Sequence, residues 1–328
     1  MNELATAVFA AEADAHLLEA PRSARFAAFR AAFNPHAYLR ELAGRGFRWV
    51  ARSDPAFPPR LQSIHDPPPG LFVRGEAPLD LLTRTSIAVV GARACSGYGE
   101  SIAVTLGREL AAAGLIVVSG LARGVDAAAH RGALLAGTTV AVLGCGIDCD
   151  YPRTHAALAA EIADSGLIVS EYPPGVEPAP WRFPARNRIV AGLACATVVV
   201  EARERSGALI TADLALDEGR EVLAVPGEIT SHLSRGTNHL LRLGATPVTC
   251  VGDVLAAVGV EPRASAVRPA PLAPRLETIR AAVADAPATA DEVVRKTGVT
   301  AAEVAAALAE LELLGAVVQQ DGVYREVM

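Results

Sequence analysis

The chain has 328 residues, of which 51% are hydrophobic and 20% charged, a composition that excludes an intrinsically disordered protein and allows two or three domains. The formal net charge of −6 excludes a globally basic nucleic-acid binder but leaves room for a local basic patch. Lys296 is the only lysine among the 30 basic residues, so any contacts to phosphate are expected to come from arginine.

The cysteines and the N-terminus indicate the compartment. The chain has 5 cysteines without a C-x-x-C pair, and Cys145 and Cys149 lack the second pair that a zinc site needs, so no metal is expected. The first residues carry no basic stretch followed by an apolar core, and no apolar run approaches the roughly 18 residues of a membrane span. We therefore expect a cytoplasmic protein without a membrane segment.

Residues 1–75 predict a small helical (SAM-like) domain that ends in an extended connector. Apolar residues recur at helical spacing over 4–18 and 26–33. Proline then interrupts the pattern repeatedly, from Asn34-Pro35 to Pro67-Pro68-Pro69.

Residues 80–258 predict a Rossmann-like, doubly wound and mostly parallel α/β sheet. Short apolar runs alternate with spacers long enough for crossover helices, as expected when both faces of a parallel sheet are covered. The strand candidates are Ser86–Val90, Leu115–Ser119, Thr138–Leu143, Leu167–Ser170, Thr197–Glu201 and Glu221–Val225.

Two glycine-rich turns, each following a strand, carry one arginine. The first runs from Gly91 through Arg93 and Ser96 to Gly99, and the second contains Gly120 and Arg123. Such turns before a helix are suited to bind phosphate through backbone amides, and arginine adds a planar donor fork. The first turn departs from G-x-G-x-x-G and has no Gly-Lys-Ser/Thr, and no acidic residue ends the second strand. We therefore expect neither a nicotinamide cofactor nor triphosphate hydrolysis.

Asp126 and His130 follow the second turn at a helical spacing of four residues. They could pair as a catalytic dyad, but a helix-capping or structural pair is the preferred interpretation.

The segment from Trp181 to Arg188 alternates cations with aromatic residues. It contains Phe183, Arg186 and Arg188, a composition typical of single-strand surfaces where arginine contacts phosphate and an aromatic ring contacts a base. Five arginines and two glutamates lie between Trp181 and Gly207, a local excess of positive charge. The alternative is that these arginines pair internally with carboxylates such as Glu171 and Glu201.

Two further loops follow predicted strands. Ser206-Gly207 opens a helix, and Pro226-Gly227 precedes a segment with Gly236-Thr237. Because all five loops follow strands, they are expected to meet at the carboxyl edge of the sheet, where open α/β folds bind ligands.

The C-terminal part predicts a winged-helix domain over 275–328, after a Pro-rich linker over 259–274. Thr289 with Glu292 and Thr300 with Glu303 have the spacing of capping boxes, and Asp321-Gly322 is a hairpin signal. The expected third helix, 301–314, carries three glutamates and no basic residue, which argues against a recognition helix in DNA. We expect a protein-interaction or packing role.

Taken together, the motifs resemble the DNA-processing protein A family (DprA or Smf). The resemblance covers nearly the whole Rossmann-like region, and the three-part layout also fits. One departure is Ala92, where many members have Ser or Thr. The matching motifs are V-G-A-R-x-x-S-x-Y-G, V-S-G-L-A-R-G-V-D-x-x-A-H, S-E-Y-P-P-G, F-P-x-R-N-R-I-V-A-G-L, E-A-x-x-x-S-G-A-L-I-T-A and V-P-G followed by G-T-N.

The resemblance implies a non-enzymatic, single-stranded DNA-binding recombination mediator of natural transformation. It implies a homodimer formed through the Rossmann-like domain, protection of incoming strand, and loading of RecA onto strand covered by single-strand-binding protein. The residues expected to bind single-stranded DNA are Gly91, Arg93, Ser96, Gly120, Arg123, Phe183, Arg186, Arg188, Ser206 and Gly207.

Two other functions remain open at this point. A Rossmann-type phosphoribohydrolase acting on nucleoside monophosphates carries P-G-G-x-G-T, which here is broken because Glu228 and Ile229 follow Pro226-Gly227. A winged-helix transcription regulator would prefer duplex DNA, which the acidic C-terminal part disfavours.

Overall fold

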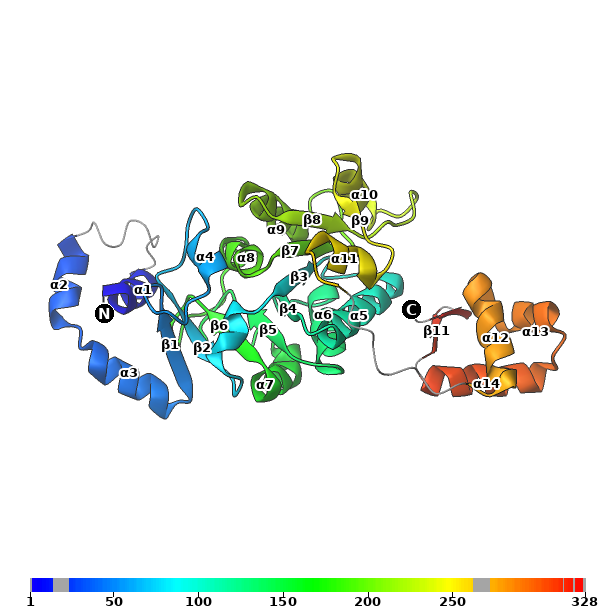
Figure 1. Cartoon of the computed structure of the whole chain (residues 1–328). Coiled ribbons are helices and arrows are strands. Elements are labelled where there is room, and N and C mark those ends of the chain that lie inside the picture. Colours follow the sequence, from blue (N-terminus) through cyan, green and yellow to red (C-terminus); the bar gives the residue numbers. More distant parts are fainter. Residues whose placement is uncertain (1, 14–23, 262–271, 315, 321, 327–328) are drawn as a thin grey trace. The chain divides into compact units, whose positions relative to one another are not determined.

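The computed structural model describes residues 2–13, 24–261, 272–314, 316–320 and 322–326 (Figure 1). These residues fall into two compact units, 1–262 and 263–328, which are described separately below.

The larger unit is built on a nine-stranded sheet with the order β1-β2-β6-β5-β4-β3-β7-β8-β9. The seven neighbouring strands β6-β5-β4-β3-β7-β8-β9 pair in parallel. At the other edge β1 pairs with β2, and β2 with β6, in antiparallel fashion. The strands are β1 (Phe47–Ala51), β2 (Gly70–Arg74), β3 (Ser86–Val90), β4 (Ile116–Ser119), β5 (Thr139–Val142), β6 (Leu167–Ser170), β7 (Ala196–Val199), β8 (Glu221–Ala224) and β9 (Thr246–Pro247).

Helices cover both faces of this sheet (Figure 1). In β3, Ile87 and Val89 pack on one face while Ala88 and Val90 pack on the other, the period-two alternation of a strand buried on both sides. One face packs against α4 (Pro59–Gln62), α8 (Arg182–Leu193), α9 (Gly207–Asp217) and α10 (Arg235–Arg242). The other packs against α5 (Gly97–Ala112), α6 (Val125–Leu134), α7 (Ala156–Ser165), α11 (Val251–Ala257), α1 (Asn2–Glu12) and α3 (Pro35–Gly44).

The predicted Rossmann-like fold is confirmed, and all six predicted strands form within two residues of their expected ends. The sequence did not predict β1, β2 and β9. Strands β1 and β2 lie in the segment expected to be a connector, because its prolines argued against regular secondary structure; each strand has five residues. Their pairing is stabilised across the strands, because the rings of Trp49 and Phe72 lie 4.6 Å apart.

The N-terminal residues are helical as expected, although part of the predicted pattern lies outside the described residues. Helix α2 (Ala24–Ala32) lies between α1 and α3 in the chain order. Phe9 of α1 packs against Phe26 and Phe29 of α2, with ring centroids 5.4 Å apart in both pairs. Within the described residues, none of the helices has the length and apolar character required to cross a bilayer.

The smaller unit is the predicted winged helix. Both capping boxes form: Thr289 and Glu292, and Thr300 and Glu303, exchange side-chain and backbone hydrogen bonds. Asp321 of the predicted hairpin turn and residues 262–271 of the predicted linker lie outside the described residues. The elements are α12 (Pro274–Asp285), β10 (Ala288–Thr289), α13 (Ala290–Thr297), α14 (Ala301–Leu313), β11 (Val317–Gln320) and β12 (Val323–Glu326), with the sheet order β10-β12-β11.

Candidate nucleic-acid interface

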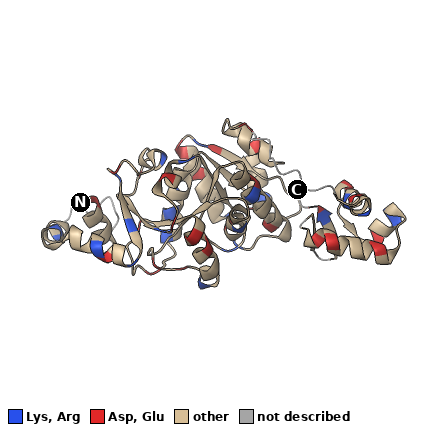
Figure 2. Cartoon of the chain, turned by 60° about the horizontal axis from the view of Figure 1, so that its bottom comes forward, with Lys and Arg blue, Asp and Glu red and all other residues tan. Residues whose placement is uncertain are grey.

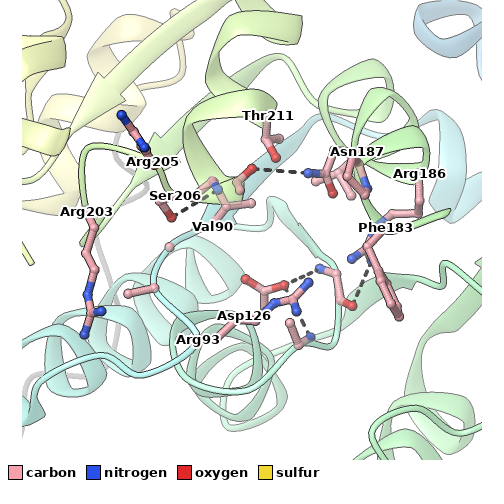
Figure 3. Close-up of a pocket in the computed structure, with 18 of the residues that line it drawn as sticks. Val90, Arg93, Asp126, Phe183, Arg186, Asn187, Arg203, Arg205, Ser206 and Thr211 are labelled. Carbon is pink, nitrogen blue, oxygen red and sulfur yellow. Dashed lines mark hydrogen bonds between the residues drawn. The ribbon is translucent and has the colours of Figure 1, made fainter. Parts of the chain in front are cut away.

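A pocket of about 470 Å³ lies at the carboxyl ends of β3, β4 and β7 (Figure 3). This is the topological switch point, because the chain continues from β3 to β4 on one side whereas β7 pairs with β3 on the other. Four of the five loops singled out in the sequence contribute to it. The lining residues are Val90–Ala94, Gly120, Ala122, Asp126, Phe183, Pro184, Arg186, Asn187, Val190, Arg203, Arg205–Ala208 and Thr211.

Arg186 forms the floor of the pocket. Its side chain, 3% exposed, donates from one terminal nitrogen to the carbonyl oxygens of Gly120, at 2.8 Å, and of Val142. These carbonyls follow β4 and end β5, so the guanidinium ties two strand ends together. A Cβ on Gly120 would lie 2.5 Å from the guanidinium nitrogens, which explains why glycine is required there. Burial lowers the pKa of Arg186, an effect that the charge of Asp126 opposes.

Asp126 occupies the amides that the sequence assigned to phosphate. Its Oδ2 accepts hydrogen bonds from the backbone N–H groups of Gly120 at 3.1 Å and Ala122 at 3.3 Å (Figure 3). Burial raises the pKa of Asp126, and the nearby positive charge of Arg186 counteracts this effect. The backbone amides of the second glycine turn therefore bind a carboxylate of the protein itself, and the Gly120 amide is not free to bind phosphate.

The first glycine turn is closed in the same way by Glu201, which is 4% exposed. The Glu201 carboxylate accepts from the Ser96 backbone N–H at 2.8 Å and from the Ser96 hydroxyl at 2.5 Å, and its carbonyl accepts from Ala92 N–H. Ser96 also caps α5 by accepting from Gly99 N–H. Ser96 thus has a structural role and does not line the pocket.

Arg188 lies outside the pocket lining and forms a buried ion-pair network. Its guanidinium donates to both oxygens of Glu171, at 2.9 and 2.7 Å, and to Asp66 at 3.0 Å. The Glu171 side chain is 1% exposed. Burial opposes the charge of Arg188, but Glu171 outweighs this and raises the pKa of the guanidinium. The internal pairing that the sequence left open is the one observed here.

The rim of the pocket carries exposed arginines. The side chains of Arg93, Arg203 and Arg205 are solvent-exposed, and no hydrogen bond or ion pair within the described residues uses their guanidinium groups. The Arg93 guanidinium lies 5.4 Å from the ring centroid of Phe183. Figure 3 shows Arg203 and Arg205 on the left of the pocket and Phe183 on its right. Such guanidinium groups can exchange water for phosphate without breaking a hydrogen bond or ion pair within the protein.

The structure therefore brings together seven of the ten residues that the sequence assigned to DNA. Arg123 is exposed but does not line the pocket, as is also the case for Ser96 and Arg188. Sequence reasoning did not select Arg203 and Arg205, although the local excess of arginine between Trp181 and Gly207 included both. The seven are Gly91, Arg93, Gly120, Phe183, Arg186, Ser206 and Gly207.

Asp126 and His130 do not hydrogen-bond to each other. The fully buried His130 contacts Thr139 instead, with 2.7 Å between Nδ1 and the hydroxyl oxygen, and Thr139 donates to Val117 O. Burial, aided by the charge of Arg186, lowers the pKa of His130 to about 3. The neutral imidazole is part of the core beneath the pocket.

Comparison with known proteins identifies the family of this chain. The model of the DNA recombination-mediator protein A family matches residues 48–259, and that of the DprA winged helix domain matches residues 261–323. The chain belongs to the DNA recombination-mediator protein A family.

Individual relatives agree with this membership. DNA processing protein DprA of Streptococcus pneumoniae is 47% identical over 208 residues, 62% of this chain and 71% of the relative. Protein Smf of Escherichia coli is 40% identical over 279 residues, 82% of this chain and 74% of the relative.

Two solved structures of the family are also similar. The crystal structure of DNA processing protein A from Streptococcus pneumoniae has 42% identity and a TM-score of 0.65, covering 70% of this chain and 80% of that one. A structure of DNA processing protein A from Helicobacter pylori, described for its single-stranded DNA binding mode, has 31% identity and a TM-score of 0.59, covering 65% of this chain and 95% of that one.

The family match extends over both units, but the pocket rim in the larger unit and helix α14 in the smaller one carry opposite charges. The pocket rim carries three exposed arginines, whereas α14 of the winged helix carries Glu303, Glu310 and Glu312. Figure 2 shows acidic residues in red on the helices of this smaller unit. Glu310 is paired with Arg275 at 2.7 Å. The rim is therefore the better candidate for contact with a polyanion.

Proposed function

We propose that this chain is a single-stranded DNA-binding recombination mediator whose strand-binding surface is the arginine rim of the pocket. One observation carries the proposal: Arg93, Arg203 and Arg205 are exposed around one pocket, and no hydrogen bond or ion pair among the described residues uses their guanidinium groups. Arginine forks neutralise phosphates, and the neighbouring aromatic surface accommodates bases without regard to sequence. The family membership and the single-strand binding of the Helicobacter pylori relative support this proposal.

A polymer suits the site better than a small nucleotide. In the two glycine turns, the amides of Ser96 and Gly120 already donate to Glu201 and Asp126 and are not available to a mononucleotide phosphate. Asp126 is the only carboxylate among the residues that line the pocket, all of which are described. Its Oδ2 accepts two backbone hydrogen bonds and is therefore poorly placed to act as the general base of a hydrolase. Phosphate is therefore expected at the rim, where the arginines are spaced around the opening.

The cellular role that we propose follows from this binding. The protein would bind and protect incoming single-stranded DNA during natural transformation, and it would load RecA onto strand that is also covered by single-strand-binding protein. It would act in the cytoplasm as a homodimer formed through the Rossmann-like domain. Its family description as a recombination mediator supports this role. The winged helix, with its acidic α14, would contact protein instead of DNA.

The test is a fluorescence anisotropy titration of a labelled oligothymidylate with the full chain at several salt concentrations. We expect Arg93→Ala, Arg203→Ala and Arg205→Ala each to weaken binding about three- to tenfold. Each lost phosphate contact should also reduce the slope of log affinity against log salt by about 0.7. Arg40→Ala is the control, because Arg40 is an exposed arginine on α3 outside the pocket. Wild-type affinity and slope in all three rim variants would refute the proposal.

A further inference from the structure

A second aromatic ring stacks against Phe183 beside the pocket. The ring centroids of Tyr151 and Phe183 lie 5.3 Å apart, with 27° between the ring planes. Tyr151 comes from the loop after β5, whereas Phe183 lies in the first turn of α8. Tyr151 is 42% exposed and Phe183 is only half-buried, so the pair joins the pocket wall to an exposed ring outside it.

Phe183 has neighbours on several sides and offers limited space to a base. Besides Tyr151, the Arg93 guanidinium lies 5.4 Å from its centroid. The backbone of Gly144 also approaches closely, because a Cβ at that position would lie 2.9 Å from Cδ1 of Phe183. A base that approaches this stack from solvent therefore meets Tyr151, the outer ring of the pair.

The charges around Tyr151 permit the approach of a polyanion. Two acidic residues precede it, but Asp150 is paired with Arg74 at 2.5 Å and Asp148 with Arg45 at 2.7 Å. These pairs offset the repulsion that two free carboxylates would exert on phosphate. Arg153, two residues further along, is exposed, and no hydrogen bond or ion pair of the described residues involves its side chain.

The loop that carries Tyr151 is also fixed in place. Both ion pairs attach it to the N-terminal part of the unit, through Arg45 after α3 and Arg74 of β2. Asp148 additionally accepts from the backbone N–H of Gly175 at 2.8 Å. A ring held in this way loses little conformational freedom when a base stacks on it.

We propose that Tyr151 is a nucleobase-stacking site that extends the strand path from the arginine rim toward Arg153. This inference rests on the proposed function, because it assumes that single-stranded DNA occupies the rim. The ligand is any nucleobase of the strand, since every base has a flat π surface and stacking on tyrosine reads no sequence. Tyr151 is a second aromatic contact, additional to Phe183.

Binding by Tyr151→Ala tests the site. With an oligothymidylate, the full-chain variant should bind about tenfold more weakly than wild type, whereas Tyr151→Phe, which keeps the ring, should bind like wild type. On a strand of the same length with abasic residues, which keeps the phosphates, Tyr151→Ala and wild type should bind equally. Tyr98→Ala is the matched control, because Tyr98 is 38% exposed and does not line the pocket.

A photochemical experiment separates direct stacking from an indirect effect through Phe183. Irradiation of wild-type protein on a strand that contains 5-iodouracil should produce a nucleotide adduct on Tyr151, located by peptide mass spectrometry. Wild-type affinity of Tyr151→Ala, an equal loss on the abasic strand, or adducts confined to Phe183 would overturn the inference. If Arg93→Ala still weakens binding in that case, the proposed function stands and only the Tyr151 site fails.

Discussion

The floor and the rim of the pocket both carry arginine, yet the residues serve different purposes. On the rim, Arg93 and Arg203 are exposed and have no described hydrogen-bonded partner. On the floor and behind it, Arg186 is bonded to two strand-end carbonyls and Arg188 to two carboxylates. Only the rim residues can exchange solvent for phosphate without losing a hydrogen bond or ion pair within the protein.

The difference shows that burial and existing partners, more than residue type, determine what an arginine does. A buried guanidinium has already been removed from water, and its partners would be left unpaired if it turned toward a ligand. An exposed one keeps its hydration and its counterions, which a phosphate can replace. Floor substitutions are therefore expected to reduce stability, and rim substitutions to reduce affinity.

The largest effect is expected from Arg188→Ala. The change leaves the Glu171 carboxylate, whose side chain is 1% exposed, without its bidentate partner. Breaking a buried pair by removing one member typically costs about 3–5 kcal/mol, and we expect that loss in the free energy of unfolding. Urea denaturation followed by circular dichroism measures it.

Arg203→Ala provides the comparison for this experiment, because truncation of an exposed side chain changes stability by roughly 0.5 kcal/mol or less. An Arg188→Ala protein that unfolds like wild type but binds the oligothymidylate poorly would place Arg188 on the binding surface and remove the distinction between floor and rim.

The elements that the sequence predicted well are those set by neighbours in the chain. Both capping boxes of the winged helix pair residues three positions apart, and the buried strands such as β3 are continuous apolar runs. Strands β1 and β2 were missed because each has five residues among prolines and is stabilised by pairing with the rest of the sheet, which local pattern does not encode.

The location of the site could be predicted from the sequence, but the hydrogen bonds and ion pairs within it could not. Loops that follow parallel strands must meet at one edge, so the pocket location could be derived. The partners could not, because Ser96 and Glu201 are 105 residues apart and Arg188 and Asp66 are 122 apart. The folded structure is needed to show which arginines form ion pairs with carboxylates such as Asp66.

A pH-dependent effect of intermediate size is expected at His130, beneath the floor. Burial, with the nearby charge of Arg186, holds its pKa at about 3, below the ordinary value of 6.5. The unfolded chain therefore binds the proton more readily, and the stability present above pH 6.5 is lost as pH falls toward 3. The slope is about 1.4 kcal/mol per pH unit, so wild type should lose about 2 kcal/mol by pH 5 from this group.

His130→Gln removes the titration while keeping a polar side chain near Thr139, whose hydroxyl lies 2.7 Å from the imidazole. Free energies of unfolding at pH 7 and pH 5 should differ less in this variant than in wild type, whereas Arg203→Ala should keep the wild-type difference. Equal pH dependence in His130→Gln and wild type would show that the imidazole is not held neutral by the floor.

The smallest effect is expected from Ser96→Ala, which tests where the floor ends and the rim begins. The serine hydroxyl donates to Glu201 and accepts from the Gly99 amide at the start of α5. Loss of an N-cap side chain costs about 1 kcal/mol, while the Ser96 backbone N–H keeps its 2.8 Å bond to Glu201. A slightly lower urea midpoint with unchanged oligothymidylate affinity would place Ser96 with the floor. The opposite result, wild-type stability with weakened binding, would extend the DNA surface into the first glycine turn, because the hydroxyl would then have to leave Glu201 for a phosphate.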